Sequence, residues 1–426
     1  MKISIYLGPK DGPMINANSV NAGNPGVGGT QFCMLLLAEY LKKKPDFQVM
    51  LISTRKYVMD GVEFQYMKHE GELYDIADKY QTDILMLSQN VSNSLRLNLN
   101  KYNFRVIIWS HNYIYSDLCE FITKTPQVAC NVFVGKQQYD RYIDDDVMIK
   151  STYIYNMYND NTPSVCREND SKTVVYMGSI IPSKGFAELC KIWPYIIKNV
   201  PNAQLLVLGS GALYGGDVKL GKYNVASESY ENKFINYITD QDGKIIPSVK
   251  FLGIVGNNKT EIFRKASVGV VNPSGRTETF GMGIVEMAEA ELPVVTIAKN
   301  GFYDTIENNV TGILSPSLSK IAKDIVYLLQ NKETNERYGK AAKERIKKFS
   351  PYIIGKQWEE ILTSVYNNDF HPSLYKHSSP LTNNHKWIRV IIKNIRSIKL
   401  FRWIPSLIKI ESFFLNILMK RVRIKN

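Results

Sequence analysis

One stretch of the sequence decides the fold: it reads ASVGVV over residues 266–271, NPSG over 272–275 and ETFGMGIVE over 278–286. The first run is apolar, which is typical of a buried strand, and the Asn-Pro-Ser-Gly sequence ends it. From about residue 280 to 290 the apolar side chains recur at helical spacing. The stretch therefore predicts a strand, a loop that carries Glu278, and a helix in which Glu286 lies about two turns from the start.

The predicted loop and helix suggest a kind of ligand. The backbone amides of Thr279, Phe280 and Gly281 would form the amino-terminal end of the helix, which favours an anion. Carboxylates such as Glu278 and Glu286 repel phosphate but accept hydrogen bonds from hydroxyl groups. A ligand with an anionic centre and hydroxylated ends, such as a nucleoside-diphosphate sugar, suits this arrangement.

The rest of the chain predicts an α/β protein with two doubly wound domains. Apolar runs alternate with helix-like stretches such as 31–43, which indicates mainly parallel sheets. The polar segment 159–172 predicts a linker between the two series of strands, and the long segment 211–246 predicts an insertion at a cleft rim or a surface excursion. The predicted strands are 3–7, 48–53, 84–88, 106–110, 128–134 and 153–155 in the first series, and 173–177, 204–208, 249–252, 268–271 and 294–297 in the second.

Five motifs occur in order along residues 1–368: GVGGT (26–30), VIIWSHN (106–112), YIYN (153–156), YMGSIIPSKG (176–185) and the stretch from Pro273 to Glu286. Together they resemble the family 4 (group 1) retaining glycosyltransferases. That family has the GT-B fold, in which two Rossmann-like domains face each other across a cleft. The resemblance implies an acceptor-side domain (1–165), a nucleotide-sugar domain (172–350), a helix that crosses back to the first domain (351–370) and a basic tail (371–426).

The resemblance also implies roles for particular residues. Glu278 would accept hydrogen bonds from the hydroxyls of the donor sugar, and Lys184 would bind the diphosphate and offset the charge that grows as the sugar leaves. His111 would bind the sugar from the opposite wall of the cleft, and Glu286 would contact the ribose. The other expected donor-binding residues are Gly28, Gly29, Ser179, Val255, Arg276, Thr279, Phe280, Gly281, Met282 and Gly283.

Taken singly, each of these residues has a plainer interpretation. Lys184 could be a surface lysine, Glu278 a carboxylate that stabilises a helix start, and Glu286 a charge on a helix face. His111 could be a structural histidine, and the glycines a flexible turn. The combination of motifs in register is what favours the site.

One position departs from the family pattern. The family usually has an arginine after the first glycine of the 176–185 motif, where this chain has Ser179. A hydroxyl donates one hydrogen bond but carries no charge, so one of two cations that bind the diphosphate is missing. Arg276 or Lys299 could replace it, and Arg264 is a weaker candidate because we expect it on a helix. A rewired clamp, a slower enzyme and an inactive relative are the alternatives, and the intact motifs favour the first.

The resemblance implies front-face displacement, because no side chain is placed as a covalent nucleophile. The departing phosphate oxygen would help to deprotonate the acceptor, and the protein would contribute positioning and charge stabilisation. The sequence shows no His, Cys or Asp cluster at metal-ligand spacing. We therefore expect no metal and no other cofactor.

The charge of the chain is concentrated at its end. The formal net charge is +13, yet residues 371–426 hold twelve of the 53 Lys and Arg residues and one of the 40 acidic residues. From 387 to 403, basic residues recur every three or four positions beside isoleucines, which predicts an amphipathic helix with a cationic face. Pro405 interrupts the pattern, and a second apolar stretch covers 410–419.

We expect this tail to bind the inner face of a membrane peripherally. Packing of two helices on the body is the plainer alternative. Nucleic-acid binding is not expected, because the body is nearly neutral and no such module is visible. Five scattered cysteines fit reduced thiols in the cytoplasm, and no 18-residue apolar window predicts a spanning helix.

The sequence thus predicts a glycosyltransferase that uses a UDP- or GDP-sugar and a lipid-linked or oligosaccharide acceptor, in lipopolysaccharide or capsule synthesis. A non-catalytic sugar-nucleotide or glycan-binding relative with a degraded clamp is the alternative. A membrane-tethered interaction protein is a third possibility, favoured only if no nucleotide binds.

Overall fold

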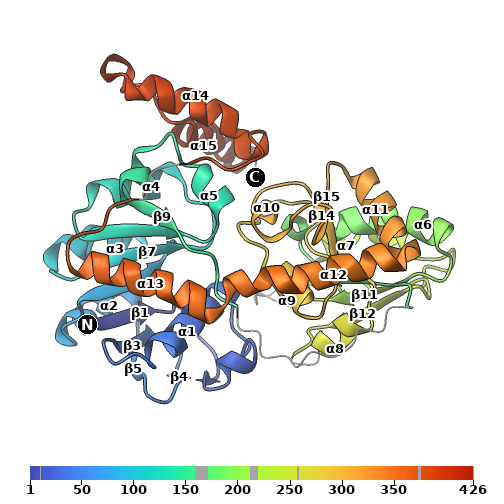
Figure 1. Cartoon of the computed structure of the whole chain (residues 1–426), viewed down its shortest axis with the longest axis horizontal. Coiled ribbons are helices and arrows are strands. Elements are labelled where there is room, and N and C mark those ends of the chain that lie inside the picture. The colour runs from blue at the N-terminus through green and yellow to red at the C-terminus, as the bar shows by residue number, and fades with distance from the viewer. Residues whose placement is uncertain (10, 159–170, 212–218, 257–258, 373–375, 426) are drawn as a thin grey trace. The chain divides into compact units, whose positions relative to one another are not determined.

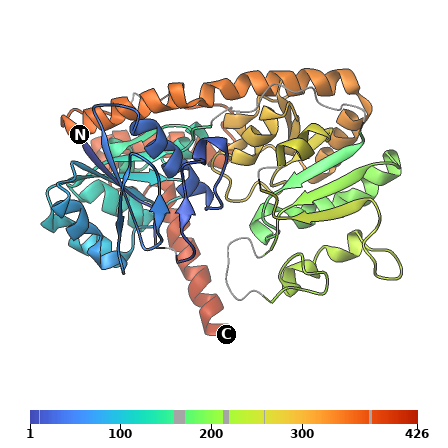
Figure 2. The same ribbon diagram turned by 90° about the horizontal axis from the view of Figure 1, so that it is seen from below.

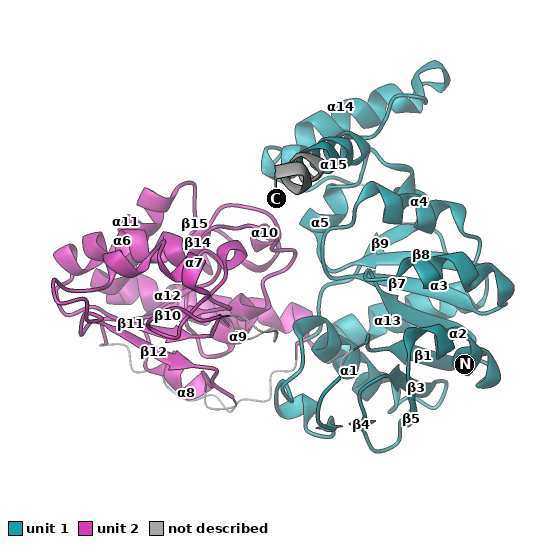
Figure 3. Ribbon diagram, turned by 180° about the vertical axis from the view of Figure 1, so that it is seen from behind, with its two compact units in different colours: residues 1–157, 351–426 teal, residues 158–350 magenta. Residues whose placement is uncertain are grey.

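The computed structural model describes residues 1–9, 11–158, 171–211, 219–256, 259–372 and 376–425. The chain divides into two compact units, which Figure 3 shows in different colours. Unit 1 comprises residues 1–157 and 351–426, and unit 2 comprises residues 158–350. Both are α/β units built on a parallel sheet, as the alternation of apolar runs predicts (Figure 1).

Unit 1 contains a seven-stranded parallel sheet in the order β5-β3-β1-β6-β7-β8-β9, and a two-stranded parallel sheet of β2 and β4. The strands are β1 (Lys2–Tyr6), β2 (Ile15–Asn16), β3 (Gln48–Ser53), β4 (Tyr57–Val58), β5 (Glu63–Tyr66), β6 (Ile84–Ser88), β7 (Arg105–Ser110), β8 (Val128–Phe133) and β9 (Ser151–Tyr153). The helices are α1 (Gly29–Leu41), α2 (Leu73–Lys79), α3 (Asn93–Asn98), α4 (Ser116–Lys124), α5 (Lys136–Asp140), α13 (Pro351–Tyr366), α14 (Lys386–Ser397) and α15 (Leu407–Lys425).

Helix α13 returns the chain to unit 1 after unit 2 is complete. Its apolar residues recur at helical spacing and are buried. Trp358 packs against Trp109 of β7, with ring centroids 4.5 Å apart. Gly355 lets α13 approach α1 closely, because a Cβ atom there would lie 2.2 Å from the ring of Tyr40. This packing joins two segments that are more than 300 residues apart in the sequence.

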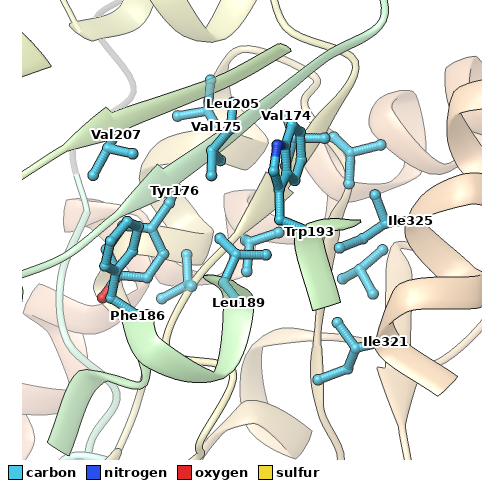
Figure 4. Packing of buried hydrophobic residues seen from close by; sticks show 14 of the residues in the cluster. Val174, Val175, Tyr176, Phe186, Leu189, Trp193, Leu205, Val207, Ile321 and Ile325 are labelled. Atoms are coloured by element: carbon cyan, nitrogen blue, oxygen red, sulfur yellow. The ribbon is translucent and has the colours of Figure 1, made fainter. Parts of the chain in front are cut away.

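Unit 2 contains a six-stranded parallel sheet in the order β12-β11-β10-β13-β14-β15. The strands are β10 (Thr173–Met177), β11 (Gln204–Leu208), β12 (Val249–Gly253), β13 (Val268–Val270), β14 (Val294–Ile297) and β15 (Gly312–Ser315). The helices are α6 (Phe186–Asn199), α7 (Glu228–Glu231), α8 (Lys259–Arg264), α9 (Met282–Glu289), α10 (Phe302–Thr305), α11 (Leu318–Gln330) and α12 (Lys332–Ile346). Figure 4 shows the core, where Phe186 and Trp193 of α6 pack against Val174 and Tyr176 of β10.

The order of the strands locates a binding region in each unit. In unit 2 the order reverses between β10 and β13, and in unit 1 it reverses between β1 and β6. In doubly wound sheets, ligands bind beyond the carboxyl ends of the strands at such a reversal. The loops that follow β10 and β13 carry Ser179 and Lys184 on one side and Glu278 on the other. The fold thus brings the motifs at 176–185 and 273–286 close together in unit 2.

Several predicted elements differ from those observed. The strand predicted at 153–155 is β9 at Ser151–Tyr153, which pairs with β8 through hydroxyl-bearing residues that an apolar criterion overlooks. Strands β5 and β15 were not predicted, since β5 is an exposed edge strand with alternating polar residues and β15 is only four residues long. The segment 159–172 falls almost entirely outside the described residues, so its role as a linker stays a prediction.

The interpretation of 211–246 as a rim insertion or surface excursion is wrong for residues 225–238, which place several side chains in the core. Tyr230, Phe234, Ile235 and Ile238 are buried in the core of unit 2. The Tyr230 hydroxyl accepts a hydrogen bond from the backbone N–H of Ala187, 3.1 Å away. The apolar residues are spaced by three or four, and this spacing is what carries them into the core.

The tail is also not a free cationic helix. Lys386 and Arg389 of α14 are buried against acidic side chains of unit 1, at Asp140 (2.7 Å) and Asp144 (3.4 Å). We name these four residues the tail anchor. Arg396 adds an ion pair with Asp146 at 2.8 Å. The predicted cationic face therefore points largely inward, because the run of aspartates at 144–146 offers it complementary charge.

The start of α15 is anchored as well. Ile408 is buried in the core of unit 1, and the backbone N–H of Leu407 donates to the carboxylate of Asp144. Helix α14 ends at Ser397, short of the predicted 403. No helix among the described residues is both long and apolar enough to cross a membrane.

Candidate active site

The centre of the candidate site is an ion pair between two loops of unit 2. Lys184 Nζ lies 3.0 Å from Glu278 Oε2, and the two side chains are 24% and 13% exposed. Lys184 ends a short 3₁₀ turn, and Gly185 follows with φ +70°, a conformation that favours glycine. A Cβ atom on Gly185 would lie 2.5 Å from the backbone nitrogen of Ser274. Glycine at this position therefore lets the two loops meet.

Asn272 fixes the carboxylate of Glu278. Its buried side-chain amide donates to Glu278 Oε2 at 3.2 Å and to the backbone carbonyl of Arg276 at 2.9 Å. The hydroxyl of Ser274 donates to Asn272 Oδ1 at 2.7 Å, which orients the amide. In the sequence Asn272 stands out only as a residue that breaks a strand. Its position directly after a buried strand was the signal that could have identified it.

Helix α9 begins later than predicted. Its N-cap is Gly281, with φ +90°, so the first helical amides belong to Met282 and Gly283 and not to Thr279 to Gly281. Glu286 is the fifth residue of the helix, a little more than one turn from its start. The turn at Gly281 accounts for the delay, because a left-handed residue cannot continue a right-handed helix.

Phe280 and Thr279 have structural surroundings. The ring of Phe280 is buried and packs edge-to-face on Phe349, with centroids 5.0 Å apart. Thr279 is buried too, and a Cβ atom on Gly301 would lie 2.2 Å from its carbonyl oxygen. These two residues hold the loop in place, and their side chains are largely removed from solvent.

Glu286 forms a second ion pair. Lys259 Nζ of α8 lies 2.7 Å from Glu286 Oε2, and both side chains are about one-quarter exposed or less. The sequence analysis missed Lys259, which no motif marks. Each of the two predicted carboxylates therefore has a lysine beside it.

Position 179, where the family usually has arginine, is buried from solvent. Ser179 is 2% exposed, and its hydroxyl has no hydrogen-bond partner among the described residues. Arg276 lies beside the Lys184 loop, with Nη1 3.4 Å from the carbonyl of Pro182 and Nη2 3.4 Å from Glu188 Oε1. Its side chain is 62% exposed, so the guanidinium is held loosely.

The other clamp candidates are less well placed. Lys299 is exposed and runs alongside Gly275, where a Cβ atom would lie 3.0 Å from that of the lysine. Arg264 ends helix α8, as expected. Val255 is half-buried and packs against the core of unit 2, so its assignment to the donor site stays a prediction.

His111 follows β7 in unit 1, as predicted. Its backbone N–H donates to Gln89 Oε1 at 2.8 Å, and its ring lies 4.6 Å from that of Trp109. Burial lowers the pKa of His111 to about 3, so the imidazole is neutral near pH 7. It can therefore exchange hydrogen bonds with a ligand but cannot supply a positive charge.

The glycine loop leads into α1. Gly28 is the N-cap, and its backbone N–H donates to Gln31 Oε1 at 3.4 Å. The Gln31 amide donates to the Leu7 carbonyl at 2.6 Å, which ties the helix start to the end of β1. A Cβ atom on Gly29 would meet no atom within 4 Å. These residues and His111 belong to unit 1, so their approach to Glu278 stays a prediction.

No group of three or more His, Cys, Asp or Glu side chains that could hold a metal ion occurs in the part of the chain that the structure describes. That no metal takes part stays a prediction of the sequence.

The strand order defines a doubly wound α/β protein, and the paired charges of unit 2 lie in the loops at the strand-order reversal. Residues 159–345 match the family described as "Glycosyl transferases group 1". This part of the chain is therefore similar to the group 1 glycosyl transferases, and the two Rossmann-like units give the chain the GT-B fold.

Two curated relatives and one solved structure illustrate the similarity. The capsular polysaccharide biosynthesis glycosyltransferase CapM of Staphylococcus aureus is 29% identical over 202 residues, which are 47% of each chain. A phosphatidyl-myo-inositol mannosyltransferase of Mycobacterium tuberculosis is 24% identical over 46% of this chain and 47% of its own length. The chain thus spans about half the length of these relatives.

The structure of HepE from Anabaena in complex with UDP shares the fold, with a TM-score of 0.64 and 14% identity over 85% of this chain and all of that one.

Proposed function

We propose that the chain is a retaining glycosyltransferase that moves a sugar from a nucleoside-diphosphate sugar to a saccharide acceptor in the synthesis of a surface polysaccharide or glycolipid. The ion pair of Lys184 and Glu278 at the strand-order reversal is the observation that carries this proposal. The family match of residues 159–345 and the names of the relatives support it.

The short distance between the two charges suits the chemistry of the donor. In a nucleoside-diphosphate sugar the reacting carbon is bonded directly to a phosphate oxygen, so a cation for phosphate and an acceptor for sugar hydroxyls must be neighbours. Lys184 Nζ and Glu278 Oε2 are 3.0 Å apart. We infer that a bound donor inserts between them, with phosphate toward the lysine and hydroxyls toward the carboxylate.

The proposed reaction is a front-face displacement. The bond between the anomeric carbon and the phosphate oxygen breaks, and a bond from that carbon to the acceptor oxygen forms on the same face. The acceptor proton passes to the departing phosphate, whose growing negative charge Lys184 offsets. The neutral His111 would position the sugar by hydrogen bonding. No metal is assigned a part, and lysines take the places beside both carboxylates.

Arg276 is our candidate for the second cation of the clamp. It contacts the carbonyl of Pro182, two residues before Lys184, whereas Ser179 carries no charge. Its long contacts leave it able to turn toward a diphosphate. The competing possibility, a non-catalytic relative that binds sugar nucleotides or glycans, is favoured by the single observation that position 179 is an uncharged, buried serine.

The donor and acceptor are proposed at the level of class. UDP is the first nucleotide to test, because HepE was solved with UDP and with UDP-glucose; GDP is the second. We propose a lipid-linked or oligosaccharide acceptor and peripheral association with the inner membrane face, and no nucleic acid partner. The names of the two curated relatives, a capsular polysaccharide biosynthesis glycosyltransferase and a phosphatidyl-myo-inositol mannosyltransferase, support this choice.

A panel of UDP- and GDP-sugars tests the proposal. The purified protein should hydrolyse or transfer sugar from at least one donor, and the anomeric configuration of the product should match that of the donor. Nucleotide binding without turnover for every donor would instead favour the non-catalytic relative. Absence of both binding and turnover would remove the assignment.

A further inference from the structure

The tail exposes apolar side chains on the side of α14 that faces away from unit 1. Trp387, Ile391, Ile395 and Ile398 lie three or four residues apart and are exposed, and Leu400 and Trp403 in the following turn are 74% and 78% exposed. We name these six residues the outer stripe. The basic residues Lys386, Arg389 and Arg396 lie on the opposite side of the helix, in ion pairs with unit 1. The helix is thus turned so that its charge is inside and its apolar face is outside.

This orientation is fixed by the tail anchor. Asp140 is fully buried, and Lys136 and Lys386 lie 2.6 and 2.7 Å from its two carboxylate oxygens. Lys386 Nζ also donates to the Ser378 carbonyl at 2.6 Å and to Gln137 Oε1 at 3.1 Å. Rotating α14 to bury the outer stripe would pull Lys386 away from Asp140. The Asp140 carboxylate would then remain buried with one cation fewer, which is costly.

The surroundings of the outer stripe favour an anionic surface. Lys399 and Arg402 are exposed within the same turn as Leu400 and Trp403. Glu411 is the only acidic residue of 371–426, and it is engaged by Arg141 and Arg389 at 2.6 Å each. The segment therefore carries cations beside its apolar residues and no other acidic group that would repel an anionic partner.

The chemistry of the outer stripe fits a lipid bilayer better than a second copy of the chain. Tryptophan at each end and cations at the rim are the side chains that favour the membrane interface. A second copy of the tail would offer Lys399 and Arg402 no free acidic partner from residues 371–426, because Glu411 already pairs with Arg141 and Arg389. Helix α15 adds exposed Phe413, Phe414 and Leu418 to the same tail, and Figure 2 shows it as the red helix that ends at the label C.

We propose that the outer stripe inserts into the headgroup layer of an anionic bilayer, while the basic side of α14 serves as the link to unit 1. This deepens the proposed membrane association, which the sequence had assigned to the cationic face. Attachment then depends mainly on buried apolar area, and Lys399 and Arg402 add a smaller attraction that salt weakens.

Flotation of the full chain with vesicles of phosphatidylcholine and phosphatidylserine tests this inference. Replacing Ile391, Ile395, Leu400 and Trp403 by Gln should lower the vesicle partition coefficient about a hundredfold, because four apolar side chains no longer leave water. The matched variant Lys399→Gln with Arg402→Gln should lower it about tenfold or less, and about 0.5 M salt should act similarly on the wild type. Unchanged circular dichroism and donor hydrolysis verify that the variants fold.

Four outcomes overturn the inference. The four-Gln variant could float like the wild type, or the charge variant alone could abolish flotation. The wild type could fail to float at all, which removes the attachment but leaves sugar transfer to a soluble acceptor intact as a separate test. Finally, light scattering could show a lipid-free dimer that the four-Gln variant dissociates without any flotation, which would assign the outer stripe to a second copy.

Discussion

The charged pairs of the site in unit 2 and those of the tail anchor in unit 1 use the same side chains at different depths. Lys184 and Glu278 are 24% and 13% exposed, and they join two loops at the end of a sheet. Lys386 and Asp140 are both fully buried and join a helix to the body. A ligand can separate an ion pair that is accessible to solvent, because such a pair contributes little free energy. Separating a buried ion pair costs much more, because it leaves an uncompensated charge in the interior. Burial, and not the residue type, separates the charges available for binding from those that hold the fold.

The largest effect should come from breaking the tail anchor. Asp140→Asn leaves Lys136 and Lys386 next to a neutral amide in a buried site, and we expect the free energy of unfolding to fall by about 3 kcal/mol or more. Urea denaturation measures this loss of stability.

The same pair makes stability depend on pH. Burial raises the pKa of Asp140, but the charges of Lys386 and Lys136 outweigh the effect of burial and hold the pKa below its usual range. The contribution of Asp140 should therefore be present at neutral pH and lost as the pH falls through that lowered value.

Lys124 provides the control for that comparison, since it pairs with Glu120 on the surface of α4 with both side chains largely exposed. Lys124→Met should change the unfolding free energy by less than about 0.5 kcal/mol. Equal losses for the two variants would contradict the distinction drawn from burial.

The second effect should appear in catalysis. Glu278→Ala and Lys184→Ala should each lower sugar transfer by at least about a hundredfold, the scale for losing one preorganised group. The isosteric Glu278→Gln should also be slow, although it can keep the geometry of the Asn272 contact. Lys265→Ala, in an exposed pair with Glu261, is the matched control and should leave the rate unchanged. Full activity of either site variant would remove the assignment.

The sequence was sufficient for most of the fold because long apolar runs become buried parallel strands. Strands β3, β6, β10, β11 and β14 begin and end where the apolar pattern predicts. The apolar pattern did not predict β5, because its apolar residues alternate with polar ones at a sheet edge. It also did not predict that Tyr230 and Phe234 enter the core, because polar residues flank them in the sequence.

The structure places Lys184 beside Glu278, and the roles of both residues stay predictions. Motif spacing pointed to Glu278, Lys184 and His111 as candidates, because loops at the ends of parallel strands collect ligand-binding groups. It missed Asn272 and Lys259, because their effect depends on which loops meet in space. The tail was misjudged for a related reason: Asp144 and Asp146 lie 245 and 250 residues from the arginines that they bind, and Asp140 is similarly distant from Lys386.

The third effect concerns a buried group that titrates. Burial lowers the pKa of His111 to about 3 in the folded protein, whereas an unfolded histidine titrates near 6.5. The unfolded chain therefore binds a proton first, and stability should fall by roughly 1.4 kcal/mol per pH unit from about pH 6 downward. Urea denaturation between pH 5 and 7 checks the slope. His111→Gln should flatten it, and an equal slope in that variant would assign the effect to other groups.

The smallest effect should come from Arg276, whose guanidinium is exposed and makes only long contacts. Arg276→Ala should raise the KM for the donor about tenfold or less, because an exposed cation contributes modestly to phosphate binding. Arg276→Lys should restore part of the affinity, and Lys299→Ala measures the competing candidate. A larger loss in Lys299→Ala than in Arg276→Ala would move the second clamp position to residue 299.

The most direct test of the central claim, that the Lys184–Glu278 pair is a nucleoside-diphosphate site, is a thermal-shift titration of the wild type and Lys184→Ala with UDP and GDP. A bound nucleotide stabilises the folded protein by mass action. We predict that one nucleotide raises the unfolding temperature of the wild type in a concentration-dependent way and that Lys184→Ala loses most of the shift. No shift with either nucleotide, or an equal shift in the variant, would contradict the account.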